Sequence, residues 1–94
     1  MRIRTFRHKG LRRLYEAGDR VGLPQNLVVR IIDVLAVIEA VPHVTRIGTL
    51  PGLRLHRLKG DLSGFWSVSI SGNWRIIFRV DGEEVFDLDL VDYH

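Results

Sequence analysis

Apolar positions in the first half of the chain repeat at the spacing of α-helices. The first helix is predicted over residues 9–17, with Gly18 ending it, and its apolar side carries Leu11, Leu14 and Tyr15. A longer helix is predicted from Pro24, because proline suits a first helical turn, to the Val41-Pro42 step, where the helix should end. Its apolar residues repeat at helical spacing and are Leu27, Val28, Ile31, Leu35 and Ile38.

The second half of the chain alternates apolar and polar residues between glycine-bearing turns, which is typical of an antiparallel meander. Strands are predicted over residues 53–58, 65–70, 74–80 and 84–91, with a further short strand over residues 3–6. Residues 44–52 show no clear period and are predicted as a loop or a short element. The predicted fold class is α+β, with two N-terminal helices packed on one face of a small, mainly antiparallel sheet.

Burial of apolar residues favours a particular strand register. Three-residue turns at 71–73 and 81–83 would place apolar residues opposite one another, whereas two-residue turns would oppose apolar to polar residues. The predicted pairs are Ile70–Trp74, Val68–Ile76, Trp66–Phe78, Phe78–Phe86, Ile76–Leu88 and Trp74–Leu90. On the opposite face the same register sets Arg75 across from Asp89, where an ion pair would stabilise the sheet weakly.

The composition indicates a small globular protein. The 94 residues are 46% hydrophobic and 27% charged, which suits one folded domain spanning residues 1–94. The absence of cysteine excludes disulfides and thiolate metal sites and suits the cytosol. The basic N-terminus lacks the apolar segment of a signal peptide, and no apolar run is long enough to span a bilayer. A cytoplasmic protein without a membrane partner is therefore expected.

Basic residues are unevenly distributed. The formal net charge is only +3, but Lys9, Arg12 and Arg13 lie in the first predicted helix, and Arg54 and Arg57 lie near the middle of the chain. Most acidic residues follow residue 60. These five basic residues are candidates for binding RNA, although a solvated basic helix face explains the pattern as well.

Two short segments and one arginine carry groups suited to proton transfer on a phosphodiester. The first segment contains His56 and Lys59, the second is Asp92-Tyr93-His94, and the arginine is Arg75. Histidine titrates near neutrality and can act as general acid or base. Lysine and arginine can stabilise the charge that accumulates on phosphate oxygens in the transition state.

Five linked motifs resemble those of HigB-type toxins, which belong to the RelE/ParE superfamily of bacterial toxin–antitoxin systems. The motifs are Phe6-Arg7-His8-Lys9-Gly10-Leu11, Leu55-His56-Arg57-Leu58-Lys59-Gly60-Asp61, Gly64-Phe65-Trp66-Ser67-Val68, Asn73-Trp74-Arg75-Ile76 and Asp92-Tyr93-His94. The resemblance runs almost from end to end. It implies a compact α+β toxin that enters the decoding site of the small ribosomal subunit and cuts mRNA there.

The same resemblance implies a set of catalytic residues, an antitoxin partner and no metal or cofactor. The implied catalytic residues are His56, Lys59, Arg75, Asp92, Tyr93 and His94. His56 and His94 would share the acid and base roles, and Asp92 would orient or charge one of these imidazoles. Lys59 and Arg75 would hold the scissile phosphate, and Tyr93 would stack on a base or donate a hydrogen bond to the phosphate.

Alternatives remain open at this point. His56 can be an ordinary boundary residue, Lys59 a turn residue, and the last three residues a frayed tail. His56, Asp92 and His94 are also the ligand types that zinc prefers, although the resemblance argues against a metal site. Two other functions compete with the ribonuclease: a topoisomerase-inhibiting toxin of the ParE branch, and a noncatalytic domain that binds RNA or protein.

Overall fold

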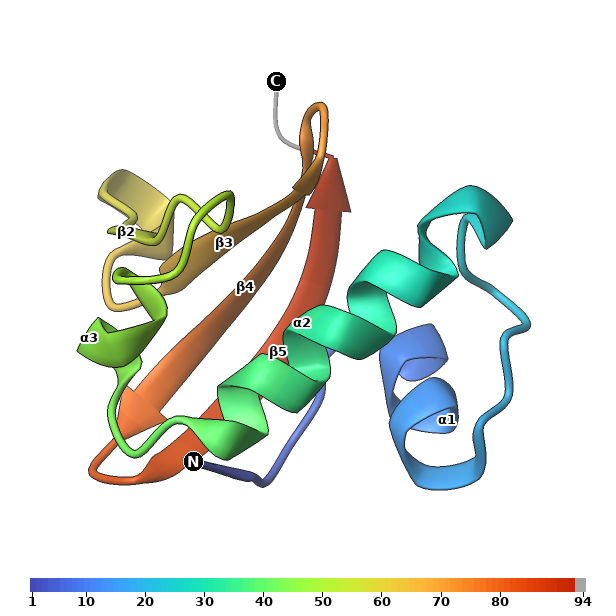
Figure 1. Ribbon diagram of the computed structural model, residues 1–94, viewed down its shortest axis with the longest axis horizontal. Coiled ribbons are helices and arrows are strands. Elements are labelled where there is room, and N and C mark those ends of the chain that lie inside the picture. The colour runs from blue at the N-terminus through green and yellow to red at the C-terminus, as the bar shows by residue number, and fades with distance from the viewer. Residues whose placement is uncertain (93–94) are drawn as a thin grey trace.

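The computed structural model describes residues 1–92, which form an α+β fold built on a mixed sheet. Figure 1 shows the helices α1 and α2 on one side of this sheet. Within the described residues the strand order is β1-β5-β4-β3-β2. The strands are β1 (Arg2–Ile3), β2 (His56–Arg57), β3 (Trp66–Ser71), β4 (Trp74–Asp81) and β5 (Glu84–Asp92). The helices are α1 (Lys9–Ala17), α2 (Val28–Ala40) and α3 (Val44–Ile47), with 3₁₀ turns η1 (Gln25–Leu27) and η2 (Gly60–Leu62).

Helix α1 has the predicted bounds, with a side-chain cap at its start and a backbone cap at its end. At its start the Leu11 N–H donates to Nδ1 of His8 over 3.2 Å, so the imidazole satisfies one of the unpaired helix donors. At its end Gly18 adopts a left-handed conformation with φ of 69°, which terminates the helix as predicted.

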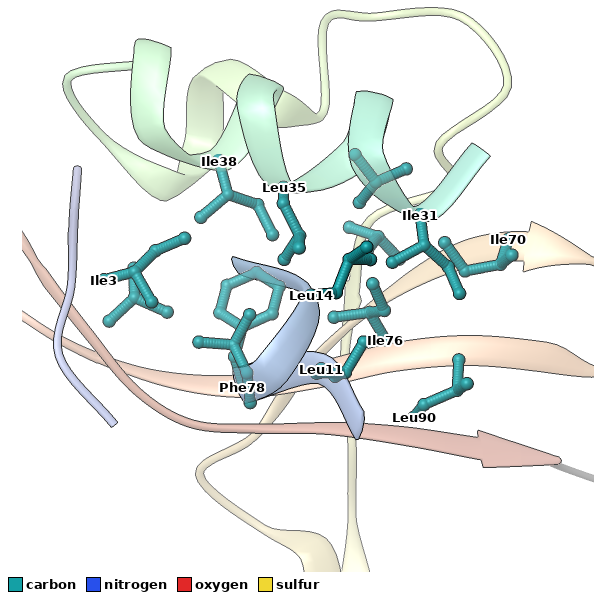
Figure 2. Close-up of a cluster of buried hydrophobic side chains, with 14 of the residues drawn as sticks. Ile3, Leu11, Leu14, Ile31, Leu35, Ile38, Ile70, Ile76, Phe78 and Leu90 are labelled. Atoms are coloured by element: carbon teal, nitrogen blue, oxygen red, sulfur yellow. The ribbon is translucent and has the colours of Figure 1, made fainter. Parts of the chain in front are cut away.

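The second predicted helix begins as the 3₁₀ turn η1 after Pro24 and continues as α2 up to Val41. Its buried side faces the sheet and packs around Phe78, as Figure 2 shows. The amino group of Met1 donates to the carbonyl oxygens of Ile38 and Glu39 at 3.0 and 2.7 Å, which ties β1 to the end of α2. Within residues 1–92 there is no helix with both the length and the apolar character needed to span a bilayer.

The sheet is mixed because β1 runs parallel to β5, whereas the other strand pairs are antiparallel. The predicted first strand is shorter than expected, and an isolated parallel bridge between Phe6 and Leu88 follows it. The predicted strand over residues 53–58 is reduced to His56–Arg57. Residues 44–52, left open by the sequence, contain the single turn of α3.

The β3–β4 hairpin confirms most of the predicted register. Trp66 lies opposite Phe78 and Val68 opposite Ile76, as predicted. The predicted Ile70–Trp74 pair is wrong, because Ser71 lies opposite Trp74 and only Gly72 and Asn73 form the turn. An irregularity between Ser69 and Ser71 absorbs the extra residue.

The predicted β4–β5 register is wrong. Asp81 pairs with Glu84, so the turn contains two residues, and a register shift follows between Ile77 and Arg79. The shift coincides with Asp87, whose φ of 57° marks a bulge in β5. As a result the observed pairs include Ile76–Leu90, Trp74–Asp92, Arg75–Val91, Ile77–Asp89 and Arg79–Phe86.

A two-residue turn combined with this bulge keeps apolar residues in the core, where a three-residue turn was predicted to do so. Val85 is fully buried before the bulge, and Leu88 and Leu90 are buried after it. Phe86 was expected opposite Phe78 in the core, but it lies opposite Arg79 and is only half-buried. The predicted Arg75–Asp89 pair does not form, because Asp89 lies opposite Ile77.

Candidate active site

His56 lies on the edge strand β2 and faces away from the helices. It pairs with Ser67 of β3, and residues directly opposite each other in an antiparallel pair share a face of the sheet. The imidazole is exposed, and its Nδ1 lies 3.2 Å from the backbone oxygen of Arg54. Arg54 itself has a φ of 48°, in the left-handed region. The contact to Arg54 leaves Nε2 as the ring nitrogen directed away from the backbone.

Lys59 begins the tight turn that follows β2. The backbone N–H of Leu58 donates to the oxygen of Phe65 at 2.9 Å and closes this turn against β3. Gly60 has a φ of 68°, which explains the glycine directly after the lysine. Lys59 precedes η2 and is exposed, so its ammonium group remains close in the chain to His56 and accessible to a phosphate.

Arg75 lies on β4, on the same sheet face as His56. It is directly opposite Ser69, yet its Nη1 donates diagonally to Oγ of Ser67, over 3.5 Å. Ser67 is in turn the residue opposite His56. The structure therefore brings His56 and Arg75 to either side of one serine.

A small apolar cluster lies next to this serine. Leu58, Phe65 and Ile77 are buried together, and Leu62 and Val91 pack against them. The Arg7 guanidinium lies 5.6 Å from the centre of the Phe65 ring. This cluster fixes the turn carrying Lys59 against β4 and excludes water from the side of Ser67 that faces Ile77.

Asp92 lies apart from His56. It ends β5 opposite Trp74, near the β3–β4 turn, as Figure 1 shows. Three strand spacings separate β5 from β2 in the sheet, a distance of roughly 14 Å. Strand alternation also places Asp92 on the face of Trp74, whereas His56 and Arg75 lie on the opposite face. Tyr93 and His94, the other two predicted site residues at this end, lie outside the described residues.

The predicted RNA-binding residues divide between two regions. Arg54 and Arg57 flank His56, and the Arg57 guanidinium lies 4.9 Å from the centre of the half-buried Trp66 ring. Lys9, Arg12 and Arg13 are exposed on α1, on the other side of the sheet. Since Arg57 and Trp66 share the face opposite His56, these residues surround the edge strand rather than line a single groove.

Sequence reasoning missed the part played by Ser67. It is fully buried, although serine is usually exposed, and its motif gave it only a place on the polar sheet face. The feature that could have drawn attention to Ser67 is its place opposite His56 in the strand register. That indication needs the β2–β3 pairing, which the sequence does not give directly.

Bacterial toxins are among the solved structures that share this fold. The YoeB/ParE toxin from Agrobacterium tumefaciens matches with a TM-score of 0.57 at 23% identity, covering 100% of this chain and 99% of that one. The toxin in a heterotetrameric YoeB–YefM toxin–antitoxin complex from Staphylococcus aureus matches with a TM-score of 0.58 at 21% identity, covering 100% and 99%. These likenesses show that the chain shares the fold of the YoeB-type toxins.

Sequence comparison identifies the family of the chain. Residues 4–94 match the HigB-like toxins, described as RelE-like toxins of the type II toxin–antitoxin system HigB. The curated Endoribonuclease HigB of Proteus vulgaris is 42% identical over 94 residues, covering 98% of this chain and 99% of the relative. The chain therefore belongs to the HigB-like toxin family. The family predicted from the five motifs is confirmed.

Proposed function

We propose that this chain is the toxin of a type II toxin–antitoxin system and acts as an endoribonuclease on mRNA held in the ribosome. The single observation that carries the proposal is 42% identity, over nearly the whole of both chains, to a curated endoribonuclease. The pairing of His56 and Arg75 around Ser67 supports it, because it places an imidazole and a guanidinium on one open surface. We further propose that residues 1–94 act as one cytoplasmic toxin domain.

The proposed reaction uses the RNA's own 2′-hydroxyl as nucleophile. A base removes the 2′ proton, the 2′ oxygen bonds to the adjacent phosphorus, and the bond from phosphorus to the 5′ oxygen breaks. The departing 5′ oxygen takes a proton from an acid, and the products are a 2′,3′-cyclic phosphate and a free 5′-hydroxyl. Two imidazoles suffice as base and acid for these transfers, and we propose His56 and His94 for these roles.

Lys59 and Arg75 are proposed to hold the scissile phosphate. Their charges would offset the negative charge that grows on the non-bridging oxygens in the transition state. Lys59 follows β2 by two residues and Arg75 shares the face of His56, which supports a phosphate site formed by both cations and the imidazole. Neither cation needs to transfer a proton in this scheme.

The distance between Asp92 and His56 limits which imidazole Asp92 can orient. Roughly 14 Å across the sheet is too far for a carboxylate to orient that imidazole directly. We therefore propose that Asp92 orients the imidazole of His94, two residues further along the chain, and not that of His56. Tyr93 stays proposed for base stacking or a hydrogen bond to the phosphate.

The exposure of His56 and Lys59 supports dependence on the ribosome. Cleavage needs the 2′ oxygen, the phosphorus and the 5′ oxygen in line, and a surface with few groups gains most when another scaffold holds the RNA in that geometry. The second expected partner is the antitoxin that a type II system supplies. An antitoxin neutralises such a toxin by binding it, so growth arrest should be relieved by the cognate gene.

Mapping cuts in mRNA from expressing cells tests this function. Primer extension should show cuts within translated codons for the wild type. Lys59→Ala should lower cutting about 100-fold, the usual loss when a charge-stabilising donor is removed, and His94→Ala by at least as much. Arg20→Ala removes the same charge from an exposed loop and should cut like the wild type.

The competing functions predict different results. Cutting that persists in both Lys59→Ala and His94→Ala would show that the proposed site is wrong. Growth arrest with DNA damage and intact mRNA would indicate topoisomerase inhibition instead. RNA or protein binding with neither effect would indicate a noncatalytic domain.

A further inference from the structure

Ser67 is the buried polar side chain nearest to the candidate site. Its exposed fraction is 0%, and it lies opposite Ile77, a member of the apolar cluster formed with Leu58 and Phe65. Burying a hydroxyl among apolar side chains is unfavourable unless a hydrogen bond compensates for the lost water. An alanine would fill nearly the same space without that cost. The presence of serine rather than alanine at this position therefore points to the group that the hydroxyl contacts.

That group is the guanidinium of Arg75. Arg75 lies directly opposite Ser69, which is also a serine on the same face of β3. Even so, Nη1 of Arg75 donates to Ser67 at 3.5 Å, one pleat further along the strand. The diagonal reach tilts the guanidinium towards the row of the sheet that contains Ser67 and His56.

We infer that Ser67 is a positioning residue, which holds the Arg75 guanidinium beside His56 so that one RNA phosphate meets both. The hydroxyl accepts from one edge of the guanidinium and leaves the other donors for the phosphate oxygens. Ser67 itself does not touch the RNA, because it is fully buried. This inference rests on the proposed ribonuclease function and adds to it the residue that sets the geometry of the phosphate site.

A double-mutant cycle with a matched control tests the inference. Ser67→Ala should lower the single-turnover rate of cutting ribosome-held mRNA about tenfold, the lower end for a lost hydrogen bond to a charged group, since the bond is long. Ser69→Ala removes the serine directly opposite Arg75 and should leave the rate within about twofold of the wild type. In an Arg75→Ala background, Ser67→Ala should have no further effect.

Two further measurements separate positioning from a general loss of stability. Thermal unfolding of Ser67→Ala should stay close to that of the wild type, because the substitution removes only one buried oxygen. NMR signals of the Arg75 guanidinium should broaden or shift in Ser67→Ala and not in Ser69→Ala. Equal rate losses with and without Arg75, or an unchanged guanidinium signal in Ser67→Ala, would overturn the inference.

The measurements distinguish failure of the proposed ribonuclease function from failure of the Ser67 inference. A wild type that does not cut ribosome-held mRNA refutes the ribonuclease, and the Arg75 signal still decides whether Ser67 holds the guanidinium. A wild type that cuts, together with Ser67→Ala cutting equally well, refutes the role of Ser67 alone.

Discussion

Two of the described histidines, His8 and His56, differ in their hydrogen bonds and surroundings. The ring of His8 accepts a hydrogen bond from the start of α1, whereas the exposed ring of His56 lies on an edge strand beside Arg54. Gly10 belongs to the first arrangement, because a Cβ at that position would lie 2.8 Å from Cε1 of His8. Helix capping therefore explains His8 and Gly10 of the first motif.

Tyr15 provides a prediction about pH. Its hydroxyl donates to Oε2 of Glu39 at 2.6 Å, and this bond, followed by burial and the Glu39 charge, raises the tyrosine pKa above its ordinary 10.0. Because the folded pKa is above the unfolded one, the resulting stability is fully present below about pH 10. It is lost as the pH rises through the folded pKa, where the phenolate forms beside a carboxylate.

Titration of tyrosinate absorbance measures this effect. The chain has two tyrosines, so Tyr93→Phe leaves Tyr15 as the only titrating phenol. Its midpoint should lie above 10.0, and Glu39→Ala should lower it towards that value. Glu16→Ala removes the adjacent carboxylate of α1 without removing the hydrogen bond, so it should change the midpoint less. Equal midpoints in Glu39→Ala and its parent would contradict the assigned cause.

Among the elements, β5 depends most on a local irregularity. A two-residue turn alone would have set Ile76 opposite Asp89, with apolar residues facing polar ones along the rest of the hairpin. The bulge at Asp87 adds one residue to β5 and returns Leu88 and Leu90 to the core. The Asp87 N–H donates to Oγ1 of Thr5 at 2.9 Å, and its carboxylate accepts from Arg79 at 3.4 Å, which anchors the bulge on both sides.

The bulge reverses the usual ranking of alanine and glycine. In an ordinary strand glycine is less stable than alanine, but a φ of 57° strains any residue with a Cβ. Asp87→Ala and Asp87→Gly lose the same carboxylate, so their difference isolates the backbone. The free energy of unfolding of Asp87→Gly should exceed that of Asp87→Ala by about 1 kcal/mol in denaturant titrations.

Asp89 supplies the matched control for this comparison. It lies two residues further along β5, opposite Ile77 in regular pairing. At this position Asp89→Ala should be more stable than Asp89→Gly. The same ranking at both positions would mean that the backbone at Asp87 is not left-handed in solution.

The elements that the sequence predicted best are those set by periodicity. Helix α1 has the predicted bounds because its apolar spacing and Gly18 act within one segment. The β4–β5 register was wrong because two turns can satisfy the same apolar pattern, one with three residues and one with two residues and a bulge. The strand predicted over residues 53–58 was overestimated because Arg54, with a φ of 48°, leaves the extended conformation, so the paired strand is only His56–Arg57.

At the scale of the whole molecule, the predicted site residues fall into two groups. His56 lies opposite Ser67 and Arg75 donates to the Ser67 hydroxyl, with Lys59 in the turn after β2, whereas Asp92 ends a strand three places away in the sheet. Motifs could supply the residue types but not this spacing, because spacing depends on strand order. The sequence also offered no reason to prefer Ser67 over Ser69, since only the diagonal reach of Arg75 distinguishes them.

An exposed site with separated groups predicts poor activity on free RNA. His56 and Lys59 are exposed, so a free transcript can contact them in many orientations, few of which align the 2′ oxygen with the departing 5′ oxygen. Purified protein should therefore cut a naked transcript at least about 100-fold more slowly than the same transcript held in ribosomes, because alignment can supply several powers of ten in rate. Gel assays of both substrates at equal protein concentration measure the ratio, with Lys59→Ala as the background control. Comparable rates on the two substrates would show that the protein aligns the RNA by itself, and the dependence on the ribosome would then be wrong.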